Sequence, residues 1–285
     1  MSDRLSVAKT YKLFINGAFP RSESGRSFVV SSPTGEFVAN VAHGSRKDVR
    51  DAVTAARGAF SKWSGASAYN RGQILYRFAE MLEARRSEFI SLVAASEEIS
   101  TKKATAMVDE GIDRVVWYAG WTDKIAQVLG GTNPVAGPYF NFSIPGPSGV
   151  IAVVAPTSSS FLGFLSTVMP PLAAGNTVVA IAGSPMSALV AVVIGEVSAT
   201  SDLPAGVLNI ITGYTAELGP VVATHEDVDG VDLAGAGDLI AALSADAAST
   251  IKRVVTSAVN EFEPPTLQRL RAFIEITTVW HTVGQ

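Results

Sequence analysis

The chain has 285 residues, a formal net charge of −4 and no cysteine, and 47% of its residues are hydrophobic. The lack of cysteine excludes disulfides, thiolate metal sites and thiol nucleophiles among these residues. The basic residues are dispersed and the three histidines, at positions 43, 225 and 281, are far apart, which argues against a nucleic-acid surface and a metal site. We find no targeting segment and expect a soluble, cytoplasmic protein.

The first 128 residues predict two pairs of short strands followed by three helices. Asn16-Gly17 between apolar residues is typical of a hairpin turn. Ser45 followed by Asp48 predicts a capped helix start. The expected elements are strands at 12–15 and near Phe19, strands at 28–30 and 37–41, and helices at 45–60, 68–95 and 100–128.

One long stretch, residues 125–195, contains no Asp, Glu, Lys or Arg. Prolines and glycines interrupt it, so no apolar run reaches the roughly 20 residues that a membrane span needs. Strands of a parallel sheet, buried on both faces, explain the same hydrophobicity. Within the stretch, the proline and glycine density of 130–148 predicts a projecting hairpin arm.

From residue 149 onward, short apolar strands alternate with helices, which predicts a parallel sheet. The residues 261–265 break this pattern, and the tail restarts as a short helix and a β-branched strand. We expect strands at 149–155, 177–181, 207–212 and 228–234, a further candidate strand at 251–259, helices at 160–174, 186–199, 215–224 and 238–247, and a tail helix at 266–271 before a strand at 273–280.

The phosphate-binding motifs of nucleotide sites are absent from this sequence. Gly235-Ala-Gly237 comes nearest to Gly-x-Gly-x-x-Gly, but Ile240 replaces the third glycine, and a single Gly-x-Gly is more often a tight turn. Thr157-Ser-Ser-Ser160 could be a nucleophile cluster, but the nearest histidine in sequence is His225. We interpret it as the cap of the following helix, whose start could still accept an anion.

Several motifs occur in an order that identifies a family. They are Lys12-Leu-Phe-Ile-Asn-Gly17, Ser32-Pro-Thr-Gly-Glu36, Ala52-Val-Thr-Ala-Ala-Arg-Gly-Ala-Phe-Ser-Lys-Trp63, Gly149-Val-Ile-Ala152, Ala174-Gly-Asn-Thr-Val-Val179, Leu203-Pro-Ala-Gly-Val-Leu-Asn-Ile-Ile-Thr-Gly213 and Val228-Asp-Gly-Val231. Over roughly residues 11–260 the chain resembles the N-terminal, cofactor-binding half of the aldehyde dehydrogenase superfamily. Tyr118-Ala-Gly-Trp121 and residues 133–142 look most like the non-catalytic repeat of its tandem-repeat branch.

The resemblance implies an α/β fold, a Rossmann-like open parallel sheet with helices on both faces, plus a small β oligomerisation arm. A degenerate NAD-binding-like domain would comprise residues 11–132 and 149–260. The arm would comprise 133–148 and 266–285. The residues 271–280 resemble the family's closing strand, so the chain is expected to pass from the cofactor half directly to that strand, with the catalytic domain missing.

The functional residues of the family do not carry over. Ser158 stands where the family has the Asn that stabilises the oxyanion, and Ile181 and Ser184 replace the Lys and Glu that hold the adenosine ribose. Leu233-Ala-Gly-Ala236 replaces the Phe-Thr-Gly-Ser that meets the pyrophosphate, and Ser257-Ala-Val-Asn260 replaces the segment with the general base. We therefore expect no enzyme, no catalytic residue and no metal site.

Three hypotheses follow. The leading one is a non-catalytic aldehyde dehydrogenase-like protein that assembles with itself or with a full-length aldehyde dehydrogenase through 133–148 and 271–281. The second is a module that binds a nucleotide or small ligand weakly. The third is an NAD(P)-dependent oxidoreductase whose catalytic domain is supplied by a partner. No cofactor is expected, or NAD or NADP at most weakly, and the vestigial cofactor-binding residues would be Pro156, Ser158, Gly213 and Gly235. No nucleic-acid or membrane partner is expected.

Overall fold

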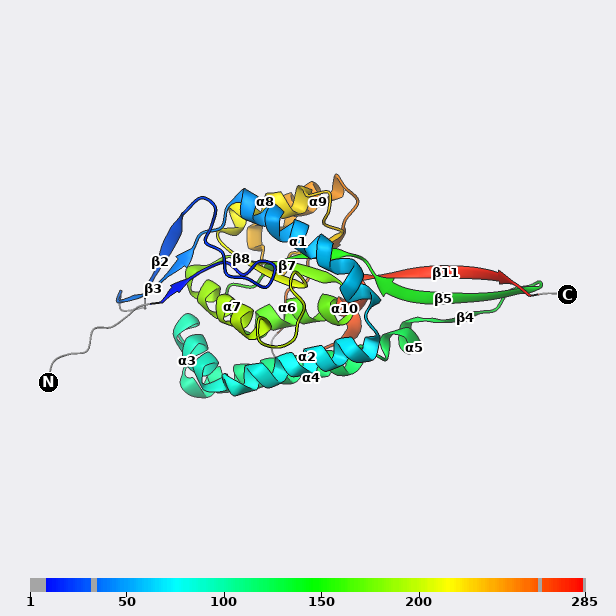
Figure 1. The fold of residues 1–285 in the computed structure, drawn as a ribbon, viewed down its shortest axis with the longest axis horizontal. Coiled ribbons are helices and arrows are strands. Elements are labelled where there is room, and N and C mark those ends of the chain that lie inside the picture. Colours follow the sequence, from blue (N-terminus) through cyan, green and yellow to red (C-terminus); the bar gives the residue numbers. More distant parts are fainter. Residues whose placement is uncertain (1–8, 32–34, 261–262, 284–285) are drawn as a thin grey trace.

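The computed structural model describes residues 9–31, 35–260 and 263–283. It contains three sheets: a small N-terminal sheet, a central five-stranded sheet between helices, and a three-stranded sheet that projects from the body as an arm (Figure 1). The predicted turn at 32–36 and the predicted break at 261–265 lie partly outside the described residues.

The central sheet is parallel throughout, as the alternation of strands and helices predicts. Its strands lie in the order β10-β9-β6-β7-β8. They are β6 (Val150–Ala155), β7 (Thr177–Ala182), β8 (Leu208–Thr212), β9 (Gly230–Asp232) and β10 (Arg253–Val255). The last two are shorter than the predicted strands at 228–234 and 251–259. β9 ends early because the chain leaves it to turn against β6 at Gly235.

Both faces of this sheet are buried, which explains why its strands carry no charge except Asp232 and Arg253. In β6, Ile151 and Val153 join one hydrophobic cluster, whereas Val150, Ala152 and Val154 join the other. Successive side chains of a strand point to opposite faces, so an entirely apolar strand is expected in the middle of a two-faced sheet.

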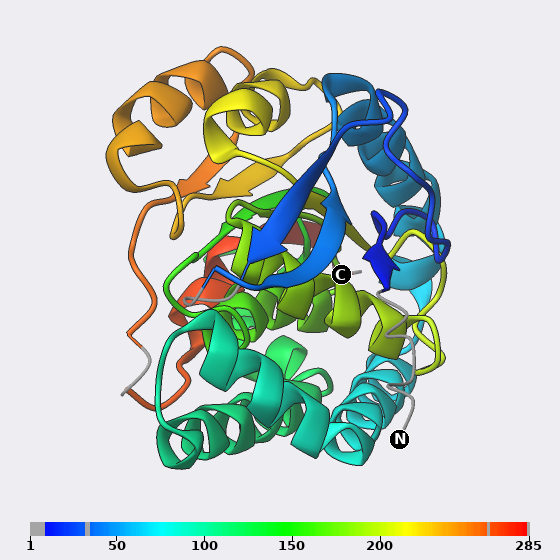
Figure 2. The same ribbon diagram turned by 90° about the vertical axis from the view of Figure 1, so that its left-hand side faces the viewer.

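The helices form layers on the two faces (Figures 1 and 2). One face carries α6 (Leu162–Ala173) and α7 (Pro185–Ser198), and the other carries α1 (Arg46–Gly65), α8 (Thr215–Thr224) and α9 (Ile240–Ala248), which follows the 3₁₀ turn η1 (Gly237–Leu239). A third layer packs outside α6 and α7. It consists of α2 (Ala68–Ala84), α3 (Arg86–Ser96) and α4 (Thr101–Trp121), and the short α5 (Ile125–Leu129) follows α4 and packs against the arm.

Two of the predicted helices are interrupted, so the continuous helices at 68–95 and 100–128 were wrong. The first breaks at Arg85, whose φ of −109° and ψ of 16° leave the helical region. Arg85 bonds to Glu196 of α7, and Phe89 stacks on Phe161 at 4.7 Å, so packing against the next layer sets the direction of α3. The second breaks after Trp121, where Thr122 is buried against α2.

The N-terminal segment closes the β8 edge of the central sheet. The predicted hairpin turn is present: Ile15 and Ala18 exchange two 3.0 Å backbone bonds around Asn16-Gly17, both with positive φ. Phe14 bridges to Ile210 of β8. The strands β1 (Thr10–Tyr11), β2 (Ser27–Ser31) and β3 (Phe37–Ala42) form the small sheet, in the order β1-β3-β2.

The arm joins segments that are far apart in sequence. Its strands β4 (Gly131–Asn133), β5 (Tyr139–Pro147) and β11 (Ile274–Thr282) are antiparallel, in the order β11-β5-β4. The helix α10 (Leu267–Ala272) precedes β11 and packs against α6. The expected α/β fold with a small β arm is confirmed.

Candidate functional site

The strand order creates one topological switch point in the central sheet. From β6 the chain proceeds outward through β7 and β8, then returns to the other side of β6 to form β9 and β10. Open α/β sheets bind ligands outside the carboxyl ends of the strands at such a point. The loops that follow β6 and β9 meet there, and they contain Pro156, Ser158 and Gly235.

Gly235 lies against the end of β6. Its N–H donates to Val154 O at 2.9 Å. A Cβ at this position would lie 2.1 Å from Ala155 O and 2.7 Å from Pro156 N, a separation that real atoms do not adopt. The glycine is therefore required by packing between the two loops, whether or not a ligand binds.

The hydroxyl cluster after β6 is largely used within the protein. Thr157 and Ser158 are exposed, but Ser159 Oγ accepts from Gly163 N at 2.8 Å and so satisfies a donor at the start of α6. The cap interpretation is confirmed, although the capping residue lies two positions before Phe161, which directly precedes the helix. Only two exposed hydroxyls remain to face a ligand.

A carboxylate occupies the neighbouring donors. Glu97 Oε1 accepts from Ser160 N at 2.7 Å and from Ser160 Oγ at 2.8 Å. A helix start attracts anions through free N–H groups and the helix dipole. Here the protein's own anion lies at that position, so the helix start is a poorer site for a phosphate than the sequence indicated.

Gly213 lies apart from the other three predicted residues. It follows β8, two strands away from β6, with a φ of +156° and its N–H donating to Ala182 O at 3.2 Å. A Cβ would lie 2.7 Å from Leu218 Cδ1. The adjacent Tyr214 packs edge-on against His43, with ring centroids 5.1 Å apart. The structure places Gly235 against Pro156, with Ser158 two residues further along the same loop, whereas Gly213 follows β8, two strands away.

Ile181 and Ser184, at the end of β7 and just after it, offer no charged group to a ligand. Ile181 is fully buried in β7 and belongs to the core cluster beneath α1 and α8. Ser184 Oγ accepts from Ser187 N at 3.2 Å and caps α7. Ile181 therefore offers no polar group to a ligand, and the hydroxyl of Ser184 is engaged with Ser187 of the same helix.

A buried ion pair next to the switch point was missed by the sequence analysis. Asp232 at the end of β9 has a fully buried side chain, which pairs with Arg269 of α10 and accepts from Ala234 N at 3.1 Å. Burial raises the pKa of Asp232, and Arg269 opposes part of that rise. An aspartate inside the apolar run 231–233 was the available signal, but its cation lies 37 residues further along the chain.

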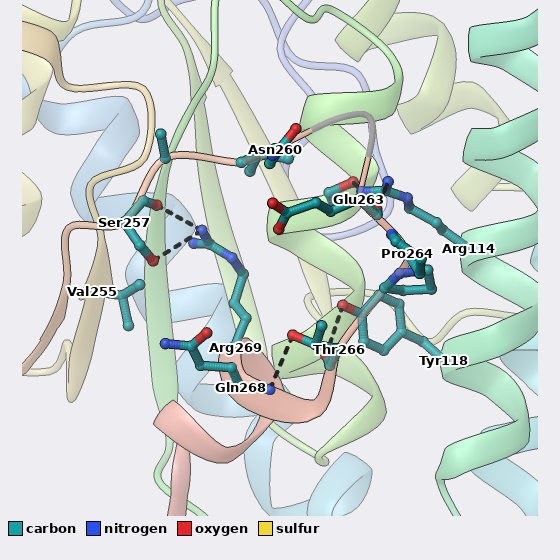
Figure 3. Close-up of a pocket in the computed structure, with 14 residues that line it drawn as sticks. Arg114, Tyr118, Val255, Ser257, Asn260, Glu263, Pro264, Thr266, Gln268 and Arg269 are labelled. Atoms are coloured by element: carbon teal, nitrogen blue, oxygen red, sulfur yellow. Dashed lines mark hydrogen bonds between the residues drawn. The ribbon is translucent and has the colours of Figure 1, made fainter.

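A polar cavity of about 320 Å³ lies between α4, α6 and the segment that leads to α10 (Figure 3). The nearly buried Arg114 donates to Glu110 Oε1 at 2.9 Å, Ser166 Oγ at 2.8 Å and Glu263 O at 2.7 Å. Burial raises the pKa of Tyr118 to about 12. The charged groups of this cavity thus hold the connecting segment, and none of the four predicted residues lines it.

The described part of the chain gives no support for a metal site or for a membrane-spanning helix. No group of three or more His, Cys, Asp or Glu side chains there could hold a metal ion. None of the described helices is long and apolar enough to cross a membrane.

Comparison with known proteins agrees with the geometry. A sequence profile described as "Aldehyde dehydrogenase family" matches residues 19–258. Aldehyde dehydrogenase family 2 member B4, mitochondrial, from Arabidopsis thaliana is 37% identical over 231 residues, covering 80% of this chain and 42% of that protein. Putative aldehyde dehydrogenase DhaS from Bacillus subtilis is 32% identical, covering 86% of this chain and 50% of that protein.

Solved structures show the same relation. HpcC from Thermus thermophilus superposes with a TM-score of 0.82 at 26% identity, over 88% of this chain and 48% of its own. An NAD⁺ complex of the Bacillus cereus aldehyde dehydrogenase superposes with a TM-score of 0.82 at 26% identity, over 86% and 50% of the two chains. The chain spans about half the length of the relatives it matches. It belongs to the aldehyde dehydrogenase family, as its sequence motifs predict.

Proposed function

We propose that this chain is a non-catalytic member of the aldehyde dehydrogenase family whose role is the assembly of homo- or hetero-oligomers with an aldehyde dehydrogenase. The arm is the observation that carries the proposal. It projects from the body, and its exposed large side chains include Tyr139, Phe140, Ile144, Ile276 and Trp280. Exposed apolar groups gathered on one element favour a protein interaction.

The state of the switch point supports the non-catalytic part of the proposal. Ile181 is buried, Ser184 caps a helix, and Glu97 occupies the donors of Ser160. A neutral hydrogen bond is worth about 0.5–1.5 kcal/mol and one to a charged group about 1.5–3 kcal/mol. Losing three such contacts weakens dinucleotide binding by roughly a thousandfold or more. The residues present do not fit a tightly held NAD.

The test combines assembly and binding. The protein, alone and co-expressed with a full-length aldehyde dehydrogenase from its own source, is measured by size-exclusion chromatography with light scattering. We expect a dimer or larger assembly in at least one preparation. A monomer of 29.8 kDa in the first and no complex in the second would refute the assembly role.

Calorimetric titration with NAD, NADP and AMP, and an assay for NADH production from aldehydes, test the remaining hypotheses. We expect no heat of binding below millimolar ligand and no NADH. Micromolar binding by the exposed Thr157 and Ser158 loop would favour the ligand-binding module instead. NADH formation only in the co-expressed complex would favour the oxidoreductase completed by a partner.

A further inference from the structure

The outer strand of the arm, β11, has an open edge with no neighbouring strand among the described residues. At its two ends, Phe273 O accepts from Ser148 N and Val283 N donates to Pro138 O, both on the β5 side. Backbone groups point to alternate sides along a strand, so the odd-numbered residues of β11 bond to β5. The outward-pointing backbone groups belong to Ile274, Ile276, Thr278, Trp280 and Thr282.

This edge has few of the features that keep edges from pairing. Natural sheets protect an open edge with charged side chains, especially lysine, or with proline, a bulge or a very short strand. The one acidic side chain of β11, Glu275, is paired with Arg253 of the body. β11 contains no lysine or proline, and it pairs with β5 in unbroken register over nine residues. Ile276 is 51% exposed and Trp280 62% exposed. The edge therefore presents a regular, partly apolar template for another strand.

We propose that two copies of this chain pair along β11 in antiparallel fashion, about a two-fold axis beside Thr278; this inference rests on the assembly role proposed above. The pairing joins the two arms into one continuous sheet. In this register Glu275 lies opposite His281 of the second copy, and Ile276 lies opposite its Trp280. Because the axis repeats each pair, there are two carboxylate–imidazole contacts and two Ile–Trp contacts.

Neighbouring registers lose this complementarity. Outward-pointing residues must face one another, so the axis passes beside a residue and not between two residues. An axis at Thr277 places Glu275 opposite Val279, and an axis at Val279 places Glu275 opposite Val283. Of these three axes, the one at Thr278 gives the carboxylate of Glu275 a donor, namely an imidazole N–H.

The geometry of the arm permits this contact. Glu275 and His281 are both exposed, and as a non-hydrogen-bonded pair their α-carbons would be about 4.5 Å apart. Glu275 Oε1 accepts from Arg253 Nε at 2.6 Å and from Ser148 Oγ at 3.4 Å, whereas Oε2 accepts from Arg253 Nη2 at 2.7 Å and keeps a second lone pair for the imidazole. The body lies at the Ile274 end of β11, so antiparallel pairing places the two bodies at opposite ends of the sheet (Figure 1).

Cysteine cross-linking tests the register, because the chain has no cysteine of its own. Single variants Ile276→Cys, Thr277→Cys, Thr278→Cys and Val279→Cys are oxidised and examined by non-reducing electrophoresis. At Thr278 the two α-carbons would be about 5.5 Å apart, within disulfide range, whereas at Ile276 they would be about 14 Å apart. We expect a sharp maximum at Thr278 and none for Thr132→Cys on the opposite edge of the arm.

A charge variant gives a second measurement. His281→Glu places two carboxylates opposite each other at both contacts, and we expect the dimer dissociation constant from light scattering to rise about tenfold or more. His281→Gln, which keeps an N–H donor, should change it by less than about threefold. An equal effect of both variants, or none, would overturn the proposed contact.

The outcomes separate this inference from the proposed function. A dimer that cross-links best at another position, or at none, overturns the β11 register and leaves the assembly role standing. A chain that is monomeric alone but binds a full-length aldehyde dehydrogenase overturns self-pairing only. A chain that is monomeric in both preparations overturns both.

Discussion

Replacing Arg269 with methionine would leave the carboxylate of Asp232 in the interior without its cation. That carboxylate is fully buried, and it also accepts from Ala234 N. Removing one partner of a buried ion pair costs about 3–5 kcal/mol. Asp232→Ala should cost less, about 1–3 kcal/mol, because Arg269 keeps some exposure and still donates to Ser257 O at 2.7 Å.

The pH dependence of this loss has a defined sign. Burial raises the pKa of Asp232 above its ordinary value of 3.8, and Arg269 lowers it in part. A carboxyl group with a raised pKa in the folded state contributes most to stability below its unfolded pKa, and that contribution falls as the pH rises through the folded pKa. Arg269→Met raises the folded pKa further. The loss of unfolding free energy in Arg269→Met should therefore be larger at pH 7 than at about pH 5.

Urea denaturation followed by tryptophan fluorescence at both pH values measures these differences. The double variant Asp232→Ala/Arg269→Met should lie close to Asp232→Ala, because removing both charges leaves no buried charge unpaired. The reasoning would be refuted if Arg269→Met lay within about 1 kcal/mol of the wild type at pH 7. An equal deficit at both pH values would refute the electrostatic part of it.

Three further substitutions test local features. Gly235→Ala should lower the unfolding midpoint by an amount equivalent to about 1–3 kcal/mol or more, because its Cβ would meet Ala155 O, and an unchanged midpoint would contradict the packing requirement. Ser45→Ala should cost about 1 kcal/mol in chemical denaturation through loss of the capping box, while Ser91→Ala on the exposed side of α3 should cost little. Burial raises the pKa of Tyr118 to about 12, so Tyr118→Phe should remove a phenol ionisation step near pH 12 from an ultraviolet absorbance titration. Loss of a step at lower pH instead would contradict that burial.

The sequence predicted most strands and helices of the central sheet because their patterns are local. β6 and β7 are uninterrupted apolar runs, and Ser45 with Asp48 forms the predicted capping box of α1. The helix breaks at Arg85 and Thr122 were not predictable in this way. The first depends on contacts with α7 and the second on contacts with α2, and the apolar spacing of the sequence runs through both breaks.

For the candidate site, the sequence analysis identified residues that follow the carboxyl ends of the strands, but not which of them lie close together. Gly213 and Gly235 both follow strands, and only the strand order places one beside Pro156 and the other two strands away. The carboxylate of Glu97 at the start of α6 joins residues 63 positions apart. Residue spacing along the sequence does not predict a contact between residues so far apart.

The sequence by itself determined the family, the parallel sheet buried on both faces and the replacement of the family's Lys and Glu by Ile181 and Ser184, because these depend on residue type and order alone. The tertiary structure decided which groups meet: Glu97 with Ser160, Asp232 with Arg269, and β11 with β5. These partners are brought together by the packing of separate elements around two cores. Burial of apolar surface determines that packing. The polar contacts that result from it follow no periodic pattern in the sequence.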